Sequence, residues 1–77
     1  MMNDNVFAQR LNKVRKSNKL TQQKLGESVG THKQSVNNWE KGLSFPNLQT
    51  FREMCKLLDI SSDFLLGRTD NPSSHKS

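Results

Sequence analysis

Apolar residues recur along this chain at intervals of three and four, which is the spacing of one face of an α-helix. In residues 5–18, for example, Phe7, Leu11 and Val14 lie at i, i+4 and i+7, with basic residues on the opposite face. No alternating apolar and polar run long enough for a strand is present, and no segment repeats. The pattern predicts an all-α fold of five short helices.

Capping residues indicate where the later helices begin and end. Thr21 is a good N-cap for the second helix, and Gly30 is placed to end it in a left-handed conformation. A further helix is expected to begin near Asn47, and Asp59 stands at its end, where Asp tolerates the left-handed region. A short last helix is expected to begin after Ser61.

Length and cysteine content limit the kind of protein this is. Seventy-seven residues allow one domain with a small core, and the single cysteine excludes an intramolecular disulfide and a zinc site of its own. On the apolar stripe of the fourth helix, formed by Leu48, Phe51, Met54, Cys55 and Leu58, Cys55 is expected to be a small buried hydrophobe. We expect a domain over residues 1–67 and a mobile polar tail over residues 68–77.

The chain offers no membrane-spanning or secretory segment, because its longest apolar run is only three residues. We therefore expect a cytoplasmic protein that needs no cofactor, no metal and no small-molecule ligand. His32 is a poor metal ligand here, since the other histidine, His75, lies in the predicted tail.

The positive charge is concentrated in the first half of the chain. Residues 9–41 hold eight basic and two acidic residues, whereas residues 42–77 hold four of each, and Asp4 completes the net charge of +5. Such asymmetry is typical of a surface that meets a polyanion, although a lysine-rich solvated surface gives the same balance.

Two short helices joined by a glycine turn form a helix-turn-helix, whose second helix enters the DNA major groove. The stretches LTQQKLGESVGTHKQSVNNWEKG and PNLQTFREMCKLLDISSDFLLG resemble the Cro/C1-type (lambda-repressor-like, XRE family) helix-turn-helix proteins over about residues 7–67. The resemblance implies a lambda-repressor-like domain with the motif at about residues 21–40. One departure is Gly26, where the family usually has Ala; a small residue is still needed there.

The start of the recognition helix admits two registers. Thr31 with Gln34 would form a capping box, in which Gln34 folds back on the backbone. The family pattern instead places the cap at His32 and makes Lys33 the first helical residue. We favour the family register, which leaves Gln34 free to read DNA.

The register selects the residues expected to contact DNA. Side chains of Lys, Gln and Asn suit base edges, because Gln and Asn pair bidentately with adenine and Lys donates to guanine. The base-contacting candidates are Lys33, Gln34, Asn38 and, ranked lower, Asn37; each could instead be an ordinary exposed polar residue. The phosphate-contacting candidates are Gln22, Ser35, Lys41, His32, Lys24 and Arg10, of which His32 could instead cap the helix or simply be exposed.

Other residues of the motif are expected to be structural. Val36 and Trp39 share one face of the recognition helix, which favours core packing of Trp39 over stacking on a ligand. By resemblance, Arg15 pairs with Glu40 and ties the first helix to the end of the recognition helix. For Phe45, a dimer contact and packing under its loop remain equally open.

The sequence predicts a sequence-specific transcriptional regulator, of the phage or mobile-element repressor kind, that binds a palindromic double-stranded DNA operator as a homodimer. It is either a compact regulator or the DNA-binding fragment of a longer repressor. The alternative is an antitoxin-type protein-interaction module with secondary operator binding, for which the tail is short. No catalytic constellation or phosphate loop suggests an enzyme, and RNA binding would call for exposed aromatic residues.

Overall fold

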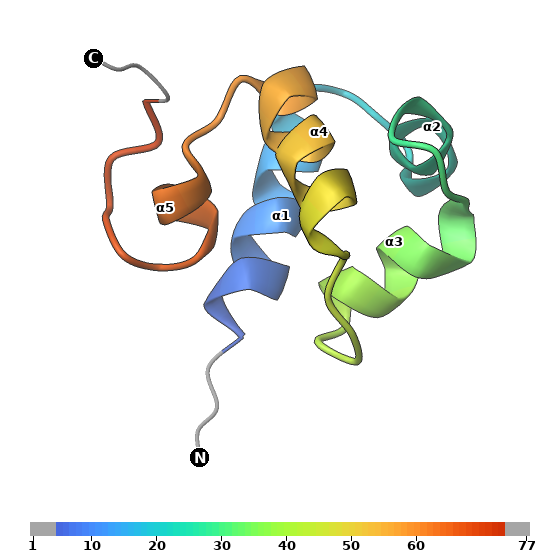
Figure 1. Ribbon diagram of the computed structural model, residues 1–77, viewed down its shortest axis with the longest axis horizontal. Helices are drawn as coiled ribbons and strands as arrows, with labels where there is room; N and C mark the ends of the chain where they lie inside the picture. The colour runs from blue at the N-terminus through green and yellow to red at the C-terminus, as the bar shows by residue number, and fades with distance from the viewer. Residues whose placement is uncertain (1–4, 74–77) are drawn as a thin grey trace.

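The computed structural model describes residues 5–73. Residues 1–4 and 74–77, which include Asp4 and His75, lie outside the described range. Within this range the chain folds into five α-helices, as predicted, and contains no strand. The helices are α1 (Val6–Ser17), α2 (Gln22–Ser28), α3 (Lys33–Glu40), α4 (Leu48–Leu58) and α5 (Ser62–Leu65). In Figure 1, α2 and α3 lie on one side of α1 and α4, and α5 lies on the other.

The predicted caps form at three helix starts. Thr21 Oγ1 accepts a hydrogen bond from Lys24 N at 3.0 Å, Asn47 Oδ1 accepts one from Thr50 N at 2.8 Å, and Ser61 Oγ accepts one from Phe64 N at 3.2 Å. Each cap satisfies a backbone N–H that the helix itself leaves unpaired, and such caps contribute about 0.5–2 kcal/mol each.

Residues in the left-handed backbone conformation end α2 and α4 at the positions that the sequence predicted. Gly30 follows α2 with φ of +83°, and Asp59 ends α4 with φ of 53° and ψ of 51°. Lys19 also has a positive φ, of 60°, in the turn between α1 and α2. Nothing in the sequence singled out Lys19, because only Gly and, less often, Asn or Asp signal this conformation.

All five helices contribute to one core. Val36 and Trp39 are buried in it, on the face of the helix that the sequence predicted to pack inward. The five largest side chains that are completely enclosed come one from each helix: Leu11, Leu25, Val36, Met54 and Leu65. The core therefore fixes α3 by its inner face and leaves the opposite face of this helix exposed.

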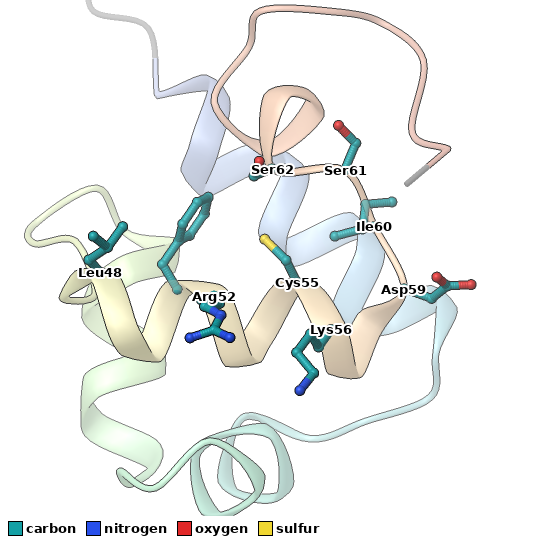
Figure 2. A pocket seen from close by; sticks show the side chains of 9 residues that line it. Leu48, Arg52, Cys55, Lys56, Asp59, Ile60, Ser61 and Ser62 are labelled. Carbon is teal, nitrogen blue, oxygen red and sulfur yellow. The ribbon is translucent and has the colours of Figure 1, made fainter. Parts of the chain in front are cut away.

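The predicted apolar stripe of α4 is buried only in part. Met54 and Leu58 lie in the core, Phe51 and Cys55 are half-buried, and Leu48 is 81% exposed. Cys55 is thus a half-buried thiol, not the fully buried hydrophobe that the sequence predicted, and burial still raises its pKa. It lies in a hollow along α4 and the α4–α5 connection, which Figure 2 shows in close-up.

The segment after α5 is hydrogen-bonded to the body of the domain. Pro72 O accepts a hydrogen bond from Ser61 N at 3.0 Å, and Arg10 of α1 donates to Thr69 O at 2.7 Å. Where the sequence predicts a mobile tail from residue 68, the structure therefore gives residues 69 and 72 definite partners. Among residues 5–73, no helix is both long enough and apolar enough to cross a membrane.

Candidate nucleic-acid interface

Helices α2 and α3 approach each other closely at Gly26. A Cβ atom at this position would lie 2.7 Å from the carbonyl carbon of His32 and 2.8 Å from its carbonyl oxygen, too close for a real Cβ contact. The Gly26 carbonyl also accepts a hydrogen bond from Thr31 N at 2.8 Å. The glycine that departs from the family's usual Ala therefore sets how near the first turn of α3 lies to α2.

The register of α3 is the one that the family pattern predicts. His32 is the N-cap residue, with extended backbone angles, and its carbonyl accepts a hydrogen bond from Ser35 N at 3.1 Å. The alternative Thr31–Gln34 capping box does not form: the Thr31 hydroxyl donates to Ser35 Oγ at 2.9 Å, and Gln34 extends toward Asn38. Gln34 is consequently exposed on the outer face of α3.

The outer face of α3 carries three of the base-contacting candidates. Lys33 and Gln34 are exposed and Asn38 is partly exposed, and Gln34 Nε2 donates to Asn38 Oδ1 at 3.0 Å. Lys33 occupies the first turn of α3, where the helix dipole disfavours a cation and where no acidic residue offsets it. This placement therefore makes no favourable contribution to the stability of the helix.

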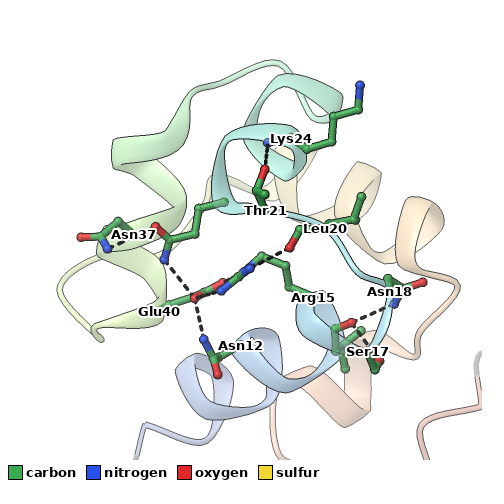
Figure 3. Close-up of polar contacts among 11 residues, drawn as sticks. Asn12, Arg15, Ser17, Asn18, Leu20, Thr21, Lys24, Asn37 and Glu40 are labelled. Atoms are coloured by element: carbon green, nitrogen blue, oxygen red, sulfur yellow. Dashed lines mark hydrogen bonds and ion pairs between the residues drawn. The ribbon is translucent and has the colours of Figure 1, made fainter.

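A group of partly buried polar side chains joins α1, α2 and α3, and we call Asn12, Arg15, Gln22 and Glu40 the polar hub (Figure 3). Arg15 Nε donates to Glu40 Oε2 at 2.6 Å and Arg15 Nη2 donates to Glu40 Oε1 at 3.1 Å. The two side chains are only 10% and 5% exposed. The pairing that the resemblance implied is therefore present in the structure.

The remaining donors of the hub complete the environment of the carboxylate. Asn12 Nδ2 and Gln22 Nε2 donate to Glu40 Oε1 at 2.8 and 3.1 Å, and Arg15 Nη1 donates to Leu20 O at 2.7 Å. Asn12 was not among the residues predicted from the sequence. Its position three residues before Arg15, on the same face of α1, was the available signal.

The hub keeps Glu40 ionised. Burial by itself raises the pKa of Glu40, but the hydrogen bonds from Arg15, Asn12 and Gln22, together with the charge of Arg15, lower it below the ordinary value of 4.5. The carboxylate therefore stays charged at neutral pH and holds the end of α3 against α1 and α2.

The hub extends outward to a fourth base-contacting candidate. Asn37 Nδ2 donates to Gln22 Oε1 at 3.3 Å, while the amide nitrogen of Gln22 is bonded to Glu40. Gln22, a phosphate-contacting candidate, and Asn37 are thus both oriented by buried groups. Asn37 is half-buried, as is Asn38.

The other phosphate-contacting candidates lie in two places. Lys24 on α2 and His32 and Lys41 at the ends of α3 are exposed on the helix-turn-helix, and Ser35 is half-buried there. Arg10 is elsewhere: its guanidinium donates to Phe64 O and Thr69 O, each at 2.7 Å. Arg10 also pairs with Asp70 and lies 4.1 Å from the centre of the Phe64 ring. Since this places it on the α5 side of the domain (Figure 1), we leave Arg10 out of the candidate interface.

Two short helices in close contact, the second with an exposed polar outer face and joined to the first by the polar hub, define a helix-turn-helix DNA-binding domain. Residues 11–65 match the family model described as helix-turn-helix (HTH_3). The chain belongs to this family of Cro/C1-type helix-turn-helix domains, as the resemblance indicated.

Individual relatives agree with this assignment. The uncharacterized HTH-type transcriptional regulator YobD of Bacillus subtilis (strain 168) is 37% identical over 67 residues, which are 87% of this chain and 60% of YobD. Repressor protein C2 of Salmonella phage P22 is 32% identical over 65 residues, which are 84% of this chain and 30% of that repressor. The chain thus spans less than two thirds of the length of the first relative and about a third of the second.

A solved structure extends the likeness to three dimensions. The crystal structure of the P22 c2 repressor protein in complex with synthetic operator 9T matches this fold with a TM-score of 0.77 at 30% sequence identity. The match covers 82% of this chain and 96% of the other. The lambda-repressor-like fold predicted from the sequence is therefore confirmed.

Proposed function

We propose that this chain is a sequence-specific, double-stranded DNA-binding transcriptional regulator of the phage or mobile-element repressor kind. The observation that carries the proposal is the exposed polar face of α3, held in a fixed orientation by the polar hub. The likeness to a repressor crystallised with operator DNA supports α3 as the element that enters the major groove.

Lys33, Gln34 and Asn38 are the proposed base-contacting residues, with Asn37 beside them. Lys donates to guanine O6 and N7, and an amide side chain that is free to rotate can pair with adenine N6 and N7. A good bidentate pair discriminates against the wrong base by about 1–3 kcal/mol. Four such side chains on eight helical residues are enough to select a short half-site.

Phosphate contacts are proposed on both sides of this face. Gln22 stands at the N-terminus of α2, where backbone N–H groups point outward and favour an anion. The hub leaves one hydrogen of its amide nitrogen for a phosphate oxygen. The remaining proposed phosphate contacts are Ser35, Lys41, His32 and Lys24.

Dimerisation on DNA is the second part of the proposal, and it involves an apolar surface formed by Phe45, Leu48 and Leu66. These side chains are 66%, 81% and 51% exposed and line one hollow at the start of α4. The ring of Phe45 also lies 5.2 Å from that of Phe7, so Phe45 packs on the domain and is still available to a second copy. A dimer with two-fold symmetry would bind half-sites about one helical turn apart and exclude polymerase from an overlapping promoter.

Footprinting on the DNA that flanks the gene for this chain tests the proposal. We expect a symmetric protected site, and no protection at low salt would contradict regulation of its own gene. Lys33→Ala should reduce affinity for that site and alter the preferred sequence, whereas Lys56→Ala, an equal loss of charge from exposed α4, should leave the preferred sequence unchanged. Affinity should also fall steeply with salt; a flat salt response would indicate a protein partner instead.

A further inference from the structure

Two adjacent asparagines on α3, Asn37 and Asn38, have different hydrogen-bond partners. Asn38 accepts: its Oδ1 takes a hydrogen bond from Gln34 Nε2 at 3.0 Å. Asn37 donates: its Nδ2 gives a hydrogen bond to Gln22 Oε1 at 3.3 Å. Identical side chains next to each other in the sequence are therefore turned in opposite senses by their neighbours.

The sense of an amide side chain decides what it offers to a base. The group carries an acceptor oxygen on one side and two N–H donors on the other, and rotation about its last torsion exchanges them. Asn38 turns its oxygen toward Gln34, so its N–H donors face away from Gln34. Asn37 turns its nitrogen toward Gln22, so its oxygen faces away from Gln22.

The partners differ in how firmly they are fixed. Gln22 donates to Glu40 at 3.1 Å, and Glu40 is paired in turn with the buried Arg15, so the orientation of Asn37 comes from the polar hub. Gln34 is exposed, and the orientation of Asn38 depends on one hydrogen bond, the one that it accepts from Gln34 along the helix. Changing Gln34 should therefore release Asn38 without disturbing the fold.

We propose that these partners give the two asparagines opposite base preferences: Asn38 reads an acceptor edge, that of guanine or thymine, and Asn37 reads a donor edge, that of adenine or cytosine. Guanine presents O6 and N7, and thymine presents O4, as acceptors in the major groove; adenine N6 and cytosine N4 are donors. Gln34 and Asn38 then act as one coupled unit. This inference rests on the proposed function, because it concerns the same face of α3.

The test is selection of preferred sites from a duplex DNA library with a randomised central segment. The full chain is compared with Asn37→Ala and Asn38→Ala, whose lost preferences identify the base that each asparagine reads. Asn37→Asp and Asn38→Asp are then compared as a matched pair. Each adds one negative charge next to the DNA, so both lose affinity, but an ionised carboxylate can only accept hydrogen bonds.

Asn38→Asp should replace guanine or thymine by cytosine or adenine at its base, whereas Asn37→Asp should keep its preference. Gln34→Ala should admit adenine at the base read by Asn38, with a loss of discrimination of about fivefold or more. Lys56→Ala, on the exposed surface of α4, is the control for a change outside the interface, and it should leave the base read by Asn38 unaffected. Urea unfolding of each variant checks that the polar hub is intact.

The outcomes separate the inference from the proposed function. If the unsubstituted chain enriches no sequence, the proposed function itself is wrong. If it enriches a site, but Asn38→Asp or Gln34→Ala leaves the base read by Asn38 unchanged, the coupling is overturned while DNA recognition stands. If Asn37→Ala changes no base preference, or Asn37→Asp reverses one, the part of the inference that concerns Asn37 is overturned.

Discussion

Substitution of Gly26 by Ala places two known effects in opposition. Within α2, Ala stabilises the helical conformation by about 1 kcal/mol relative to Gly. Its Cβ atom would, however, lie within 2.8 Å of both the carbonyl carbon and the carbonyl oxygen of His32. Because these are backbone atoms, no side chain can rotate out of the way, and the first turn of α3 has to move.

Forcing a methyl group into a filled space costs about 1–3 kcal/mol. Setting this against the gain of about 1 kcal/mol in helix propensity, we expect Gly26→Ala to destabilise the fold by roughly 0–2 kcal/mol. The effect on DNA binding should be larger than the effect on stability. Lys33 and Gln34 directly follow His32, so a shift of this turn moves two proposed base contacts at once.

Urea unfolding and DNA affinity, measured on the same preparations, test this expectation. Ser28→Ala is the control, because Ser28 is an exposed residue of α2 and its replacement gains helix propensity without a close contact. A Gly26→Ala variant that is about 1 kcal/mol more stable than the unsubstituted chain, with equal DNA affinity, would refute the close approach of α2 and α3.

Three further substitutions test other parts of the structure. Glu40→Gln should destabilise the fold at neutral pH by up to about 3–5 kcal/mol, because it leaves Arg15 buried and unpaired. Because folding lowers the pKa of Glu40, the stabilisation by the ionised carboxylate is present above the ordinary pKa of 4.5 and is lost as pH falls through the lower pKa of the folded state. In urea titrations the free energies of unfolding of the original and the Glu40→Gln protein should therefore approach each other in acid. A difference that stays constant with pH would contradict this. Arg10→Ala should cost about 1.5–3 kcal/mol of stability without changing the DNA affinity of the folded protein, and the reverse result would make Arg10 a phosphate contact after all. Leu48→Ser should change stability by less than about 0.5 kcal/mol but weaken dimerisation on DNA, measured by sedimentation; unchanged dimerisation would remove Leu48 from the interface.

The helix boundaries were predictable because their signals are local. The caps Thr21, Asn47 and Ser61 each bond to a backbone N–H only three residues away, and Asp59 adopts the left-handed conformation at its own position. No knowledge of the rest of the fold is needed to identify such residues. The same holds for Val36 and Trp39, whose spacing places them on one helix face.

Contacts between distant residues were not predictable in this way. Arg10 and Asp70 are 60 residues apart in the sequence, and Asn12 and Glu40 are 28 residues apart. No pattern within a short segment of the sequence can therefore indicate either contact. The prediction that Arg10 contacts a DNA phosphate rested on its charge, whereas in the structure Arg10 binds the segment after α5. The Arg15–Glu40 pair, also distant, was anticipated only through the family resemblance.

The apolar stripe of α4 shows a different limit of sequence reasoning. Periodicity indicates which face of a helix a residue occupies but not how deeply that face is covered at each turn. Leu48 shares the stripe with Met54, yet it begins the helix and its Cβ is tilted back toward the preceding loop. Met54, about one and a half turns further along α4, is completely enclosed in the core.

The polar hub is better explained by the orientation of α3 than by stability. A buried ion pair often contributes no more than well-packed apolar residues would, because both charges lose their hydration. An apolar contact, however, is tolerant of small rotations, whereas Glu40 accepts four hydrogen bonds in defined directions from side chains of α1 and α2. The end of α3 is thus fixed before any partner arrives, and the ordering cost of binding falls mainly on exposed side chains such as Lys33 and Gln34.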